Sequence, residues 1–230
     1  MDIKENLRYW DEYDWPSAGD EWSAAWGSSQ EQWNTQIFPH ISRFVPTHTI
    51  LEIAPGYGRW TQFLYPLCTR LILVDLVSKC IDACRRRFAC VDHIEYHVND
   101  GRSLDAIENN SVDFVFSMDS LVHADPTVMR EYTLQLGRKL RDGGLGFIHH
   151  SNLGAYHHWL LAKSLIVKCC RGNCWLGNLL IHDCLSDRNM TAAQMRRFLE
   201  ESKLECVSQE TFPWGSSRRP IDAFTVFRNK

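Results

Sequence analysis

The sequence predicts an α/β fold in which helices cover both faces of a doubly wound, mostly parallel β-sheet. Short apolar runs alternate along the chain with segments of helical periodicity, which is the pattern of repeated βαβ units. The 230 residues are 44% hydrophobic and 23% charged, so one full apolar core can be buried. No repeat, linker or shift in composition marks a second domain.

Strands are expected where apolar residues run together, at 49–54, 70–75, 93–98, 112–118, 144–150, 204–210 and 221–228. Helices are expected between them, at 58–66, 78–88, 126–140, 154–167 and 191–202. Residues 142–146, with the sequence DGGLG, are expected to stop the third helix before the fifth strand begins. Thr191 is a capping residue for the last helix, in which Met195, Phe198 and Leu199 share one face.

A tight turn follows the first strand, in the stretch ILEIAPGYGRWT at residues 50–61. Gly56 and Gly58 lack a Cβ, so the backbone can turn sharply and approach a ligand. The free N–H groups of such a turn can bind a pyrophosphate dinucleotide or S-adenosylmethionine. The dinucleotide fingerprint needs a third glycine, but Thr61 stands at that position. Its neighbour Trp60 is too bulky for the close packing that a third glycine permits.

Acidic residues follow the second and third predicted strands. Asp75 ends the run LILVDL and lies 23 residues after Glu52, about where a βαβ unit places the carboxylate that binds ribose hydroxyls. Asp100 and Gly101 follow the third strand, and residues 113–125, DFVFSMDSLVHAD, supply a fourth strand that ends in polar side chains.

This order of motifs resembles the class I S-adenosylmethionine-dependent methyltransferases. In that family, an acid followed by x-x-x-Gly-x-Gly ends the first strand, an acid after the second strand holds the ribose, and an acid after the third contacts the adenine. The resemblance covers residues 49–150, and the remaining pattern fits through residue 228. It implies a seven-stranded sheet whose last two strands form a hairpin. Ala54-Pro55 departs from the family, in which many members have a further glycine.

The resemblance implies S-adenosyl-L-methionine as the cofactor and assigns residues to it. The family motifs fall on Glu52, Gly56, Gly58, Asp75 and Asp100. The full set expected to bind the cofactor is Glu52, Gly56, Tyr57, Gly58, Asp75, Asp100, Gly101, Asp119 and Trp26.

The N-terminal segment, residues 1–48, is unusually rich in aromatic side chains. It holds Trp10, Trp15, Trp22, Trp26 and Trp33 among nine tryptophans in the chain. Aromatic residues at this density seldom stay in solvent, so we expect a helical cap within the same domain as residues 49–230. Two interpretations stay open: the indoles only pack against the sheet, or residues 21–33 form a lid over cofactor and acceptor. Residues 166–187 are expected to form an insertion or a further lid.

Polar side chains follow the fourth and fifth predicted strands, at the edge where open α/β sheets bind ligands. Asp119, His149 and His150 are the candidate catalytic groups, because a poorly acidic hydroxyl needs a base or a metal before it can accept a methyl group. Consecutive strand residues point to opposite faces, so only one of the two histidines is expected to face the pocket. The residues expected to bind the acceptor are His123, Asn152, Tyr57 and Trp22.

Three stretches resemble a subgroup of small methyltransferases that modify sugars and polysaccharides: SMDSLVHAD at 117–125, GGLGFIHHSNLGAY at 143–156, and residues 188–210. The resemblance implies an O-methyltransferase for a saccharide or a related small molecule. In related sugar methyltransferases a divalent cation can bind the acceptor hydroxyls. Asp119, one of the two histidines, with His150 preferred, and Asp222 are expected to supply such a site, for Mg²⁺ or another divalent cation.

Other functions stay open at this point. A methyltransferase for a phenolic or nitrogenous small molecule needs no metal, because its acceptor loses a proton more easily. A non-catalytic module would keep Glu52, Asp75 and Asp100 and bind cofactor without turnover. A nicotinamide oxidoreductase rests on the analogy of fold alone.

Composition narrows the partners and the location. A net charge of −3 and a pI near 6.4 give no general attraction to nucleic acid. No apolar run reaches the ~18 to 20 residues of a membrane span, and no signal-peptide pattern opens the chain, so we expect a cytoplasmic protein without membrane association. Nine cysteines fit free thiols in a reducing compartment. Those at 168–184, together with His182, match no usual zinc template. No pattern indicates the oligomeric state.

Overall fold

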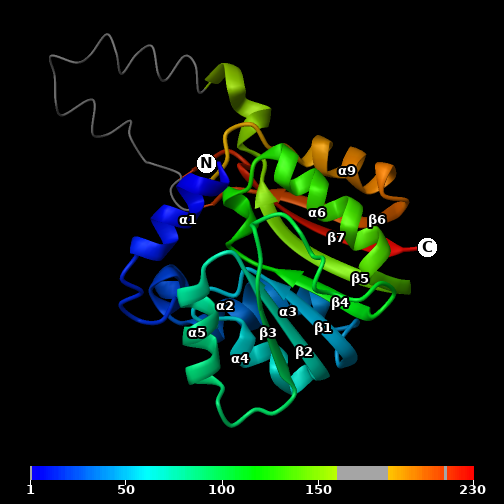
Figure 1. Cartoon of the computed structure of the whole chain (residues 1–230). Coiled ribbons are helices and arrows are strands. Elements are labelled where there is room, and N and C mark those ends of the chain that lie inside the picture. The colour runs from blue at the N-terminus through cyan, green and yellow to red at the C-terminus, as the bar shows by residue number, and fades with distance from the viewer. Residues whose placement is uncertain (1, 160–185, 215–216) are drawn as a thin grey trace, which may run out of the picture.

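The computed structural model describes residues 2–159, 186–214 and 217–230. Its centre is a seven-stranded sheet in the order β3-β2-β1-β4-β5-β7-β6, shown in Figure 1. The strands are β1 (Thr47–Ile53), β2 (Cys68–Asp75), β3 (Ile94–Val98), β4 (Val112–Ser117), β5 (Leu140–Ser151), β6 (Leu204–Phe212) and β7 (Asp222–Asn229). All neighbours pair in parallel except β7, which is antiparallel to both β5 and β6. The predicted fold, including the final hairpin, is confirmed.

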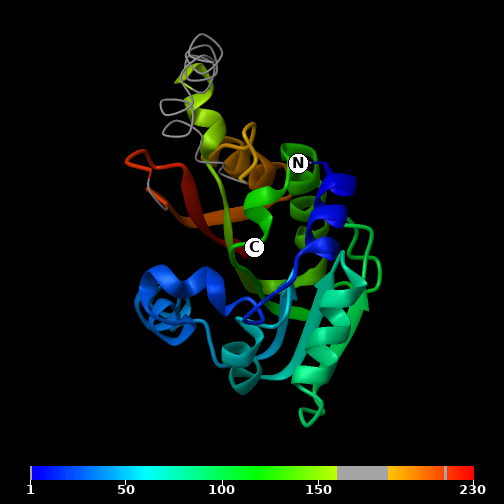
Figure 2. The same cartoon turned by 90° about the vertical axis from the view of Figure 1, so that its left-hand side faces the viewer.

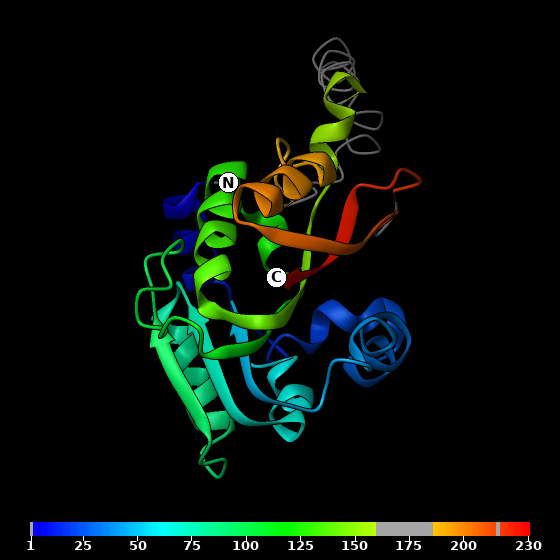
Figure 3. The same cartoon turned by 90° about the vertical axis from the view of Figure 1, so that its right-hand side faces the viewer.

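The helices cover both faces of the sheet, as the alternation of apolar side chains requires. The helices are α1 (Ile3–Glu12), α2 (Ser29–Gln32), α3 (Phe38–Ile41), α4 (Thr61–Leu64), α5 (Ser78–Arg87), α6 (Pro126–Lys139) and α9 (Ala192–Glu201). In β2, Leu71 and Leu73 face one core while Ile72 and Val74 face the other. Helices α6 and α9 lie together on one face (Figures 1 and 3), and α3, α4 and α5 pack on the opposite face.

The N-terminal segment divides into two parts that differ in burial. In α1, a capping box joins Asp2 and Glu5, but no residue of the helix is fully buried. A 3₁₀ turn (Asp20–Trp26), α2, a π turn (Trp33–Ile37) and α3 follow. Trp33, Ile37 and Ile41 are at most 5% exposed and belong to the main core. Residues 33–41 therefore pack against the sheet, whereas α1 lies on the surface (Figure 2).

Two predicted element boundaries were wrong. The helix expected at 58–66 is only α4, followed by a 3₁₀ turn at Tyr65–Leu67 that contains Pro66. The glycines at 142–146 do not stop α6, which ends at Lys139. They lie inside β5, where the pairing with β4 shifts register between Val112 and Phe114. DGGLG thus forms an irregularity within a strand. Glycine is common both at such irregularities and at the ends of helices, so the sequence pattern alone does not separate the two.

Of the last two predicted helices, one is described in full and the other in part. Helix α9 forms as expected, with the Thr191 side chain accepting a hydrogen bond from the Gln194 N–H at 3.0 Å. The helix expected at 154–167 begins as a 3₁₀ turn, Leu153–Tyr156. Its second half, and most of the insertion predicted at 166–187, lie outside the described residues. Within the described ranges, no helix is long and apolar enough to cross a membrane.

Candidate functional site

The glycine turn leaves β1 through three residues with left-handed backbone: Ala54, Gly56 and Gly58. A Cβ at Gly58 would lie 2.5 Å from the Phe88 ring of α5, so this glycine is required by packing. The Gly56 N–H donates to Asp75 at 3.1 Å. The Cys84 thiol donates to the Gly56 carbonyl at 3.2 Å. Gly58 thus fixes the turn against α5, and Gly56 is the glycine nearer the strand ends.

Asp75 ends β2 beside this turn, as predicted. Its two carboxylate oxygens accept hydrogen bonds from the Gly56 and Val77 N–H groups, at 3.1 and 2.8 Å. Burial raises the pKa of Asp75 to about 6, and these two bonds act in the opposite direction. The carboxylate therefore stays mostly ionised at neutral pH.

Glu52 is a buried residue of β1 that is hydrogen-bonded to the segment following the glycine turn. It is 2% exposed and accepts a hydrogen bond of 2.6 Å from the Thr61 hydroxyl. Burial raises the pKa of Glu52 to about 8, although the bond from Thr61 acts to lower it. Glu52 therefore ties the end of β1 to the start of α4. In this structure it does so through a mostly neutral carboxylic acid.

Asp100 and Gly101 lie in the loop after β3. Asp100 is exposed, and its Oδ1 accepts from the N–H groups of Arg102 and Ser103, at 3.1 and 2.7 Å. Although partial burial acts to raise the pKa of Asp100, these backbone bonds hold it below its usual range. Gly101 has a φ of +84°, and its open side faces Ile3 of α1 at 3.0 Å from an ideal Cβ. The loop after β3 is thus covered by the N-terminal helix.

A charged relay lies at the ends of β4, β5 and β7, built on Arg59, Asp119, His149 and Asp222. Asp119, in left-handed backbone, accepts from the Arg59 guanidinium at 2.6 Å and contacts His149 Nδ1 at 3.0 Å. His149 Nε2 lies 3.8 Å from an Asp222 oxygen. Cation and anion alternate along the four groups. Each buried charge therefore lies next to a charge of opposite sign, which offsets the free-energy cost of removing it from water.

The two carboxylates control the protonation of His149. Burial acts to lower the pKa of His149, but Asp119 and Asp222 outweigh it and raise the pKa to about 9. Burial likewise acts to raise the pKa of Asp119, and Arg59 and His149 hold it below its usual range. His149 Nε2 and both Asp222 oxygens are buried and make no hydrogen bond with any described residue. These three atoms are therefore the members of the relay whose hydrogen-bonding capacity is unused among the described residues.

His150 faces away from this relay. Its Nδ1 lies 2.9 Å from the Ser151 carbonyl oxygen and its Nε2 lies 2.8 Å from the Thr225 hydroxyl. Burial lowers the pKa of His150 to about 4, so the ring is neutral and holds β5 to β7. The two histidines therefore point to opposite faces of β5, as the strand alternation predicts. Both ring nitrogens of His150 are already bonded, which argues against the catalytic role predicted for it and leaves His149 as the candidate base.

The cation site predicted from Asp119, His150 and Asp222 does not assemble among the described residues. Asp119 and Asp222 lie on either side of His149, whereas His150 points to the other face. No three His, Cys, Asp or Glu residues in the described ranges come together in a way that could hold a metal ion. The cysteines and His182 considered for zinc lie within residues 160–185, outside those ranges.

The residues predicted to bind the acceptor separate in the fold. Asn152 is structural: its side chain donates to the Pro220 carbonyl and accepts from the Ala192 N–H. Trp26, assigned to the cofactor, instead packs on Trp214 at 4.8 Å between ring centroids, and Trp214 lies 4.9 Å from His149. Trp26 thus contacts Trp214, which is a neighbour of His149, and its assignment to the cofactor stays a prediction.

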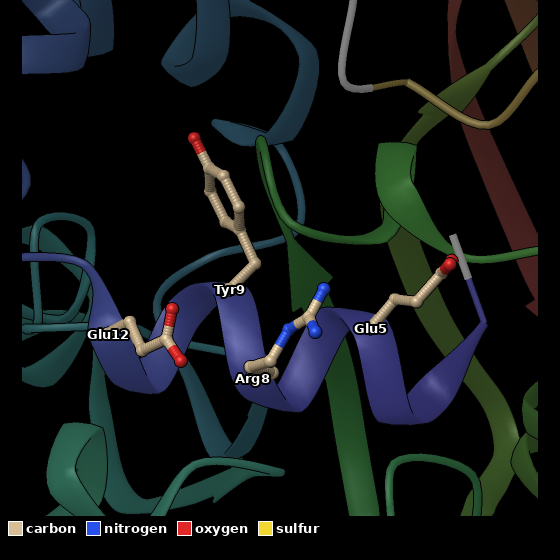
Figure 4. A pocket seen from close by; sticks show the side chains of 4 residues that line it. All are labelled: Glu5, Arg8, Tyr9 and Glu12. Carbon is tan, nitrogen blue, oxygen red and sulfur yellow. The ribbon is translucent and has the colours of Figure 1, made fainter.

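The other acceptor candidates lie with the N-terminal aromatic residues. Trp22 is 40% exposed and contacts Trp10 at 6.1 Å, and Trp10 in turn lies 5.1 Å from His123. Tyr57 is covered by Trp15. A shallow pocket on α1, lined by Glu5, Arg8, Tyr9 and Glu12 (Figure 4), includes none of the predicted site residues.

Sequence reasoning missed three residues of the site. Arg59 is buried against Trp60, bonds Ser23 at 3.2 Å and pairs with Asp119, which lies 60 residues further along the chain. Trp214 and Trp15 likewise reach the site from the β6–β7 hairpin and the N-terminal segment. The sequence offered one signal for Arg59, which is its position directly after the glycine turn. It offered none for the partner, because Asp119 lies 60 residues further along the chain.

Comparisons with known proteins show which proteins the chain resembles. Residues 50–144 match the model of the methyltransferase domain family. Nodulation protein S of Rhizobium tropici is 30% identical over 125 residues, which are 53% of this chain and 52% of that protein. The match thus spans about half the length of the curated relative.

Solved structures resemble the chain over more of its length. The N-methyltransferase NodS of Bradyrhizobium japonicum WM9, in complex with S-adenosyl-L-homocysteine, has a TM-score of 0.65 at 19% identity, covering 100% of this chain and 99% of that one. A SAM-dependent methyltransferase of Methanosarcina mazei has a TM-score of 0.62 at 14% identity, covering 84% and 97%. At these identities the likeness concerns the fold.

The fold is that of the class I methyltransferase structures, and residues 50–144 match the model of a methyltransferase domain.

Proposed function

We propose that the protein transfers the methyl group of S-adenosylmethionine to a hydroxyl of a sugar or a related small molecule, with His149 as the proton acceptor. The observation that carries this proposal is the position of His149 between Asp119 and Asp222, with Nε2 free of hydrogen bonds from the described residues. A hydroxyl is a weak acid, so its methylation needs such a base. The fold of a neighbour that binds S-adenosyl-L-homocysteine supports the cofactor.

Three residues would hold the cofactor. Asp75 would accept the ribose hydroxyls, and Gly56 and Tyr57 would line the turn beside it. The fit is supported by Gly56, whose missing Cβ lets a flat ring lie directly on the backbone: a Trp15 ring carbon lies 2.8 Å from the position of an ideal Cβ. When bound, the cofactor supplies an electrophilic methyl group on a positively charged sulfur.

The relay would take up the proton of the acceptor. Asp119 would fix the His149 ring through Nδ1, which directs Nε2 towards Asp222, and Asp222 would stabilise the imidazolium that forms when Nε2 takes the hydroxyl proton. Arg59 keeps Asp119 ionised during this step. Trp26 and Trp214 would give the acceptor an apolar wall.

A nitrogen acceptor is the second candidate. Two observations favour it: the buried carboxylate of Asp222 lacks a hydrogen-bond partner among the described residues, and a structural neighbour is an N-methyltransferase. A protonated amine would pair with Asp222 and lose its proton to His149 before accepting the methyl group.

The two candidates are separated by product analysis. Purified protein would be incubated with methyl-labelled S-adenosylmethionine and two matched panels, hydroxyl-only sugars and sugars or small amines with a free amino group. O-methyl products would support the leading proposal and N-methyl products the second. Binding of S-adenosyl-L-homocysteine without turnover on either panel would favour a non-catalytic module, and absence of binding would overturn the cofactor assignment.

His149→Gln is the matching variant, because glutamine keeps a polar side chain but accepts no proton. We expect kcat to fall by about 10² to 10⁴, as for the loss of a general base, with little change in cofactor affinity. His48→Gln, at the far end of β1 from the relay, is the control and should keep wild-type activity. Equal activity of His149→Gln and wild type would exclude His149 as the base.

A further inference from the structure

We propose that Trp15 forms a wall of the cofactor site beside the glycine turn. The proposal rests on the proposed function in one respect, since it takes the glycine turn as the place where S-adenosylmethionine binds. It assigns the covering role to residues 10–19, whereas the sequence pointed to residues 21–33.

The indole of Trp15 lies directly on the glycine turn. An ideal Cβ on Gly56 would lie 2.8 Å from one carbon of the six-membered ring and 3.0 Å from the next. The same indole is stacked on Tyr57, with 4.7 Å between ring centroids and 8° between the planes. Trp15 therefore borders both residues of the turn that the proposed function assigns to the cofactor. The open face of Gly58, by contrast, is filled by Phe88 from the core.

Polar contacts fix the backbone around Trp15 to the first residues after β2. Lys79, at the start of α5, donates to the carbonyl oxygens of Asp11 and Tyr13, at 2.7 and 3.0 Å. The Trp15 indole N–H donates to the Trp10 carbonyl at 3.3 Å. Tyr13 packs edge-on against the indole at 5.2 Å. The ring is thus held in one orientation from several sides.

The rest of the segment extends the cover over the neighbouring strand ends. Ile3 lies on Gly101 after β3, and the Asn6 side chain donates to the His123 carbonyl after β4 at 3.3 Å. Residues 3–19 therefore cross the loops that follow β1, β2, β3 and β4, as α1 and the strand ends in Figure 2 show. These loops carry the residues through which class I methyltransferases bind their cofactor.

The cover is suited to open and close. No residue of α1 is fully buried, and Trp15 itself is only partly buried. The contacts that the Lys79 side chain of α5 makes are two hydrogen bonds from its ammonium group to the carbonyl oxygens of Asp11 and Tyr13, one exposed and one partly buried. A segment held this way can separate from the core at low cost and admit a ligand. Closing it returns a large aromatic surface to the turn.

The test compares Trp15→Ala and Trp15→Phe with wild type by calorimetric binding of S-adenosyl-L-homocysteine. Loss of the ring removes one wall, so we expect the Kd to rise by about tenfold or more in Trp15→Ala. Phenylalanine keeps an aromatic ring on Gly56, so Trp15→Phe should stay within about threefold of wild type. The KM for S-adenosylmethionine should follow the Kd, with kcat less affected.

Leu7→Ala is the control, because Leu7 is an exposed apolar side chain of the same segment. It should bind as wild type does. Hydrogen exchange supplies a second readout: S-adenosyl-L-homocysteine should slow exchange of the amides in residues 10–19 of wild type, and should do so less in Trp15→Ala.

Several outcomes would overturn the proposal. Unchanged affinity in Trp15→Ala would show that the ring does not contribute, and tighter binding would show that it obstructs the site. Exchange in residues 10–19 that ignores the ligand would place the cofactor elsewhere. Failure of wild type to bind would refute the cofactor assignment itself, which is a distinguishable result.

Discussion

At the scale of single residues, the most informative contrast is between His149 and His150. The two are adjacent in sequence and both buried, yet one has a raised pKa and the other a lowered pKa. The strand alternation sends His149 towards two carboxylates and His150 towards the neutral groups of Ser151 and Thr225. Identical side chains thus become a charged relay member and a structural hydrogen-bonding group.

The raised pKa of His149 predicts how the rate depends on pH. A group with a pKa of about 9 is only about 1% neutral at pH 7, and the neutral form is the base. If His149 is the base, kcat/KM should rise about tenfold per pH unit from pH 7 and level off near pH 9. In Asp222→Asn, one carboxylate is lost, so the plateau should begin at lower pH. A flat profile in wild type would contradict the role of His149.

Stability should change in the opposite direction over the same range. The pKa of His149 is higher in the folded protein than its unperturbed value, so its contribution to the free energy of unfolding is fully present below about pH 6.5. It is lost as pH rises through about 9. The Tm of wild type should therefore fall between pH 6.5 and 9.5 more than the Tm of His149→Gln. Parallel Tm curves for the two proteins would refute this linkage.

Metal dependence is a further test at this scale. Arg59 and His149 already occupy the Asp119 carboxylate, and His150 points away, so the cation site predicted from the sequence does not form among the described residues. We therefore expect methyl transfer to persist after treatment with EDTA and gel filtration. Activity that disappears with EDTA and returns with Mg²⁺ would show that other ligands build a cation site.

At the scale of elements, the glycine turn shows how β1 and α5 fix one another. The sequence gives Gly56 and Gly58 the same standing, but their open faces meet different neighbours, Trp15 and Phe88. Only contacts between α5 and the turn reveal that Gly58 serves the core. Likewise, the glycines of β5 carry the same local signal as a helix stop, and only the pairing with β4 shows that the strand continues through them.

Gly58→Ala should destabilise the protein more than Gly143→Ala. Both glycines have positive φ, at +83° and +74°, which costs an alanine about 1 to 2 kcal/mol. Gly143 has open space around its Cβ position, whereas at Gly58 the Phe88 ring must shift, adding about 1 to 3 kcal/mol. Urea unfolding of both variants measures the difference. Equal losses would show that backbone strain alone governs these positions.

At the scale of the whole molecule, the N-terminal segment belongs to two systems. Residues 33–41 complete the core, with Trp33, Ile37 and Ile41 beneath the sheet, whereas residues 3–19 lie across the strand ends. That residues 1–48 belong to the same folding unit as 49–230 stays a prediction. The cytoplasmic location also stays a prediction, because the fold does not depend on the compartment.

Truncation tests this division. A chain that starts at residue 20 keeps the core aromatic residues, so we expect a cooperative thermal transition together with weakened binding of S-adenosyl-L-homocysteine. A chain that starts at residue 46 loses Trp33, Ile37 and Ile41 and should not fold cooperatively. Cooperative unfolding of the shorter chain would show that the segment is a separate unit.

The sequence alone determined the class of the protein, because periodicity and motif order are local. Alternating apolar runs specified the sheet, and the Gly56-x-Gly58 turn with Asp75 indicated the cofactor edge. Only the tertiary structure decided the composition of the relay. Arg59, Asp119, His149 and Asp222 come from four distant segments, and Trp15 reaches the turn from 41 residues before Gly56. These contacts form only when the strands and the N-terminal segment pack together, so they cannot be inferred from the spacing of residues along the chain.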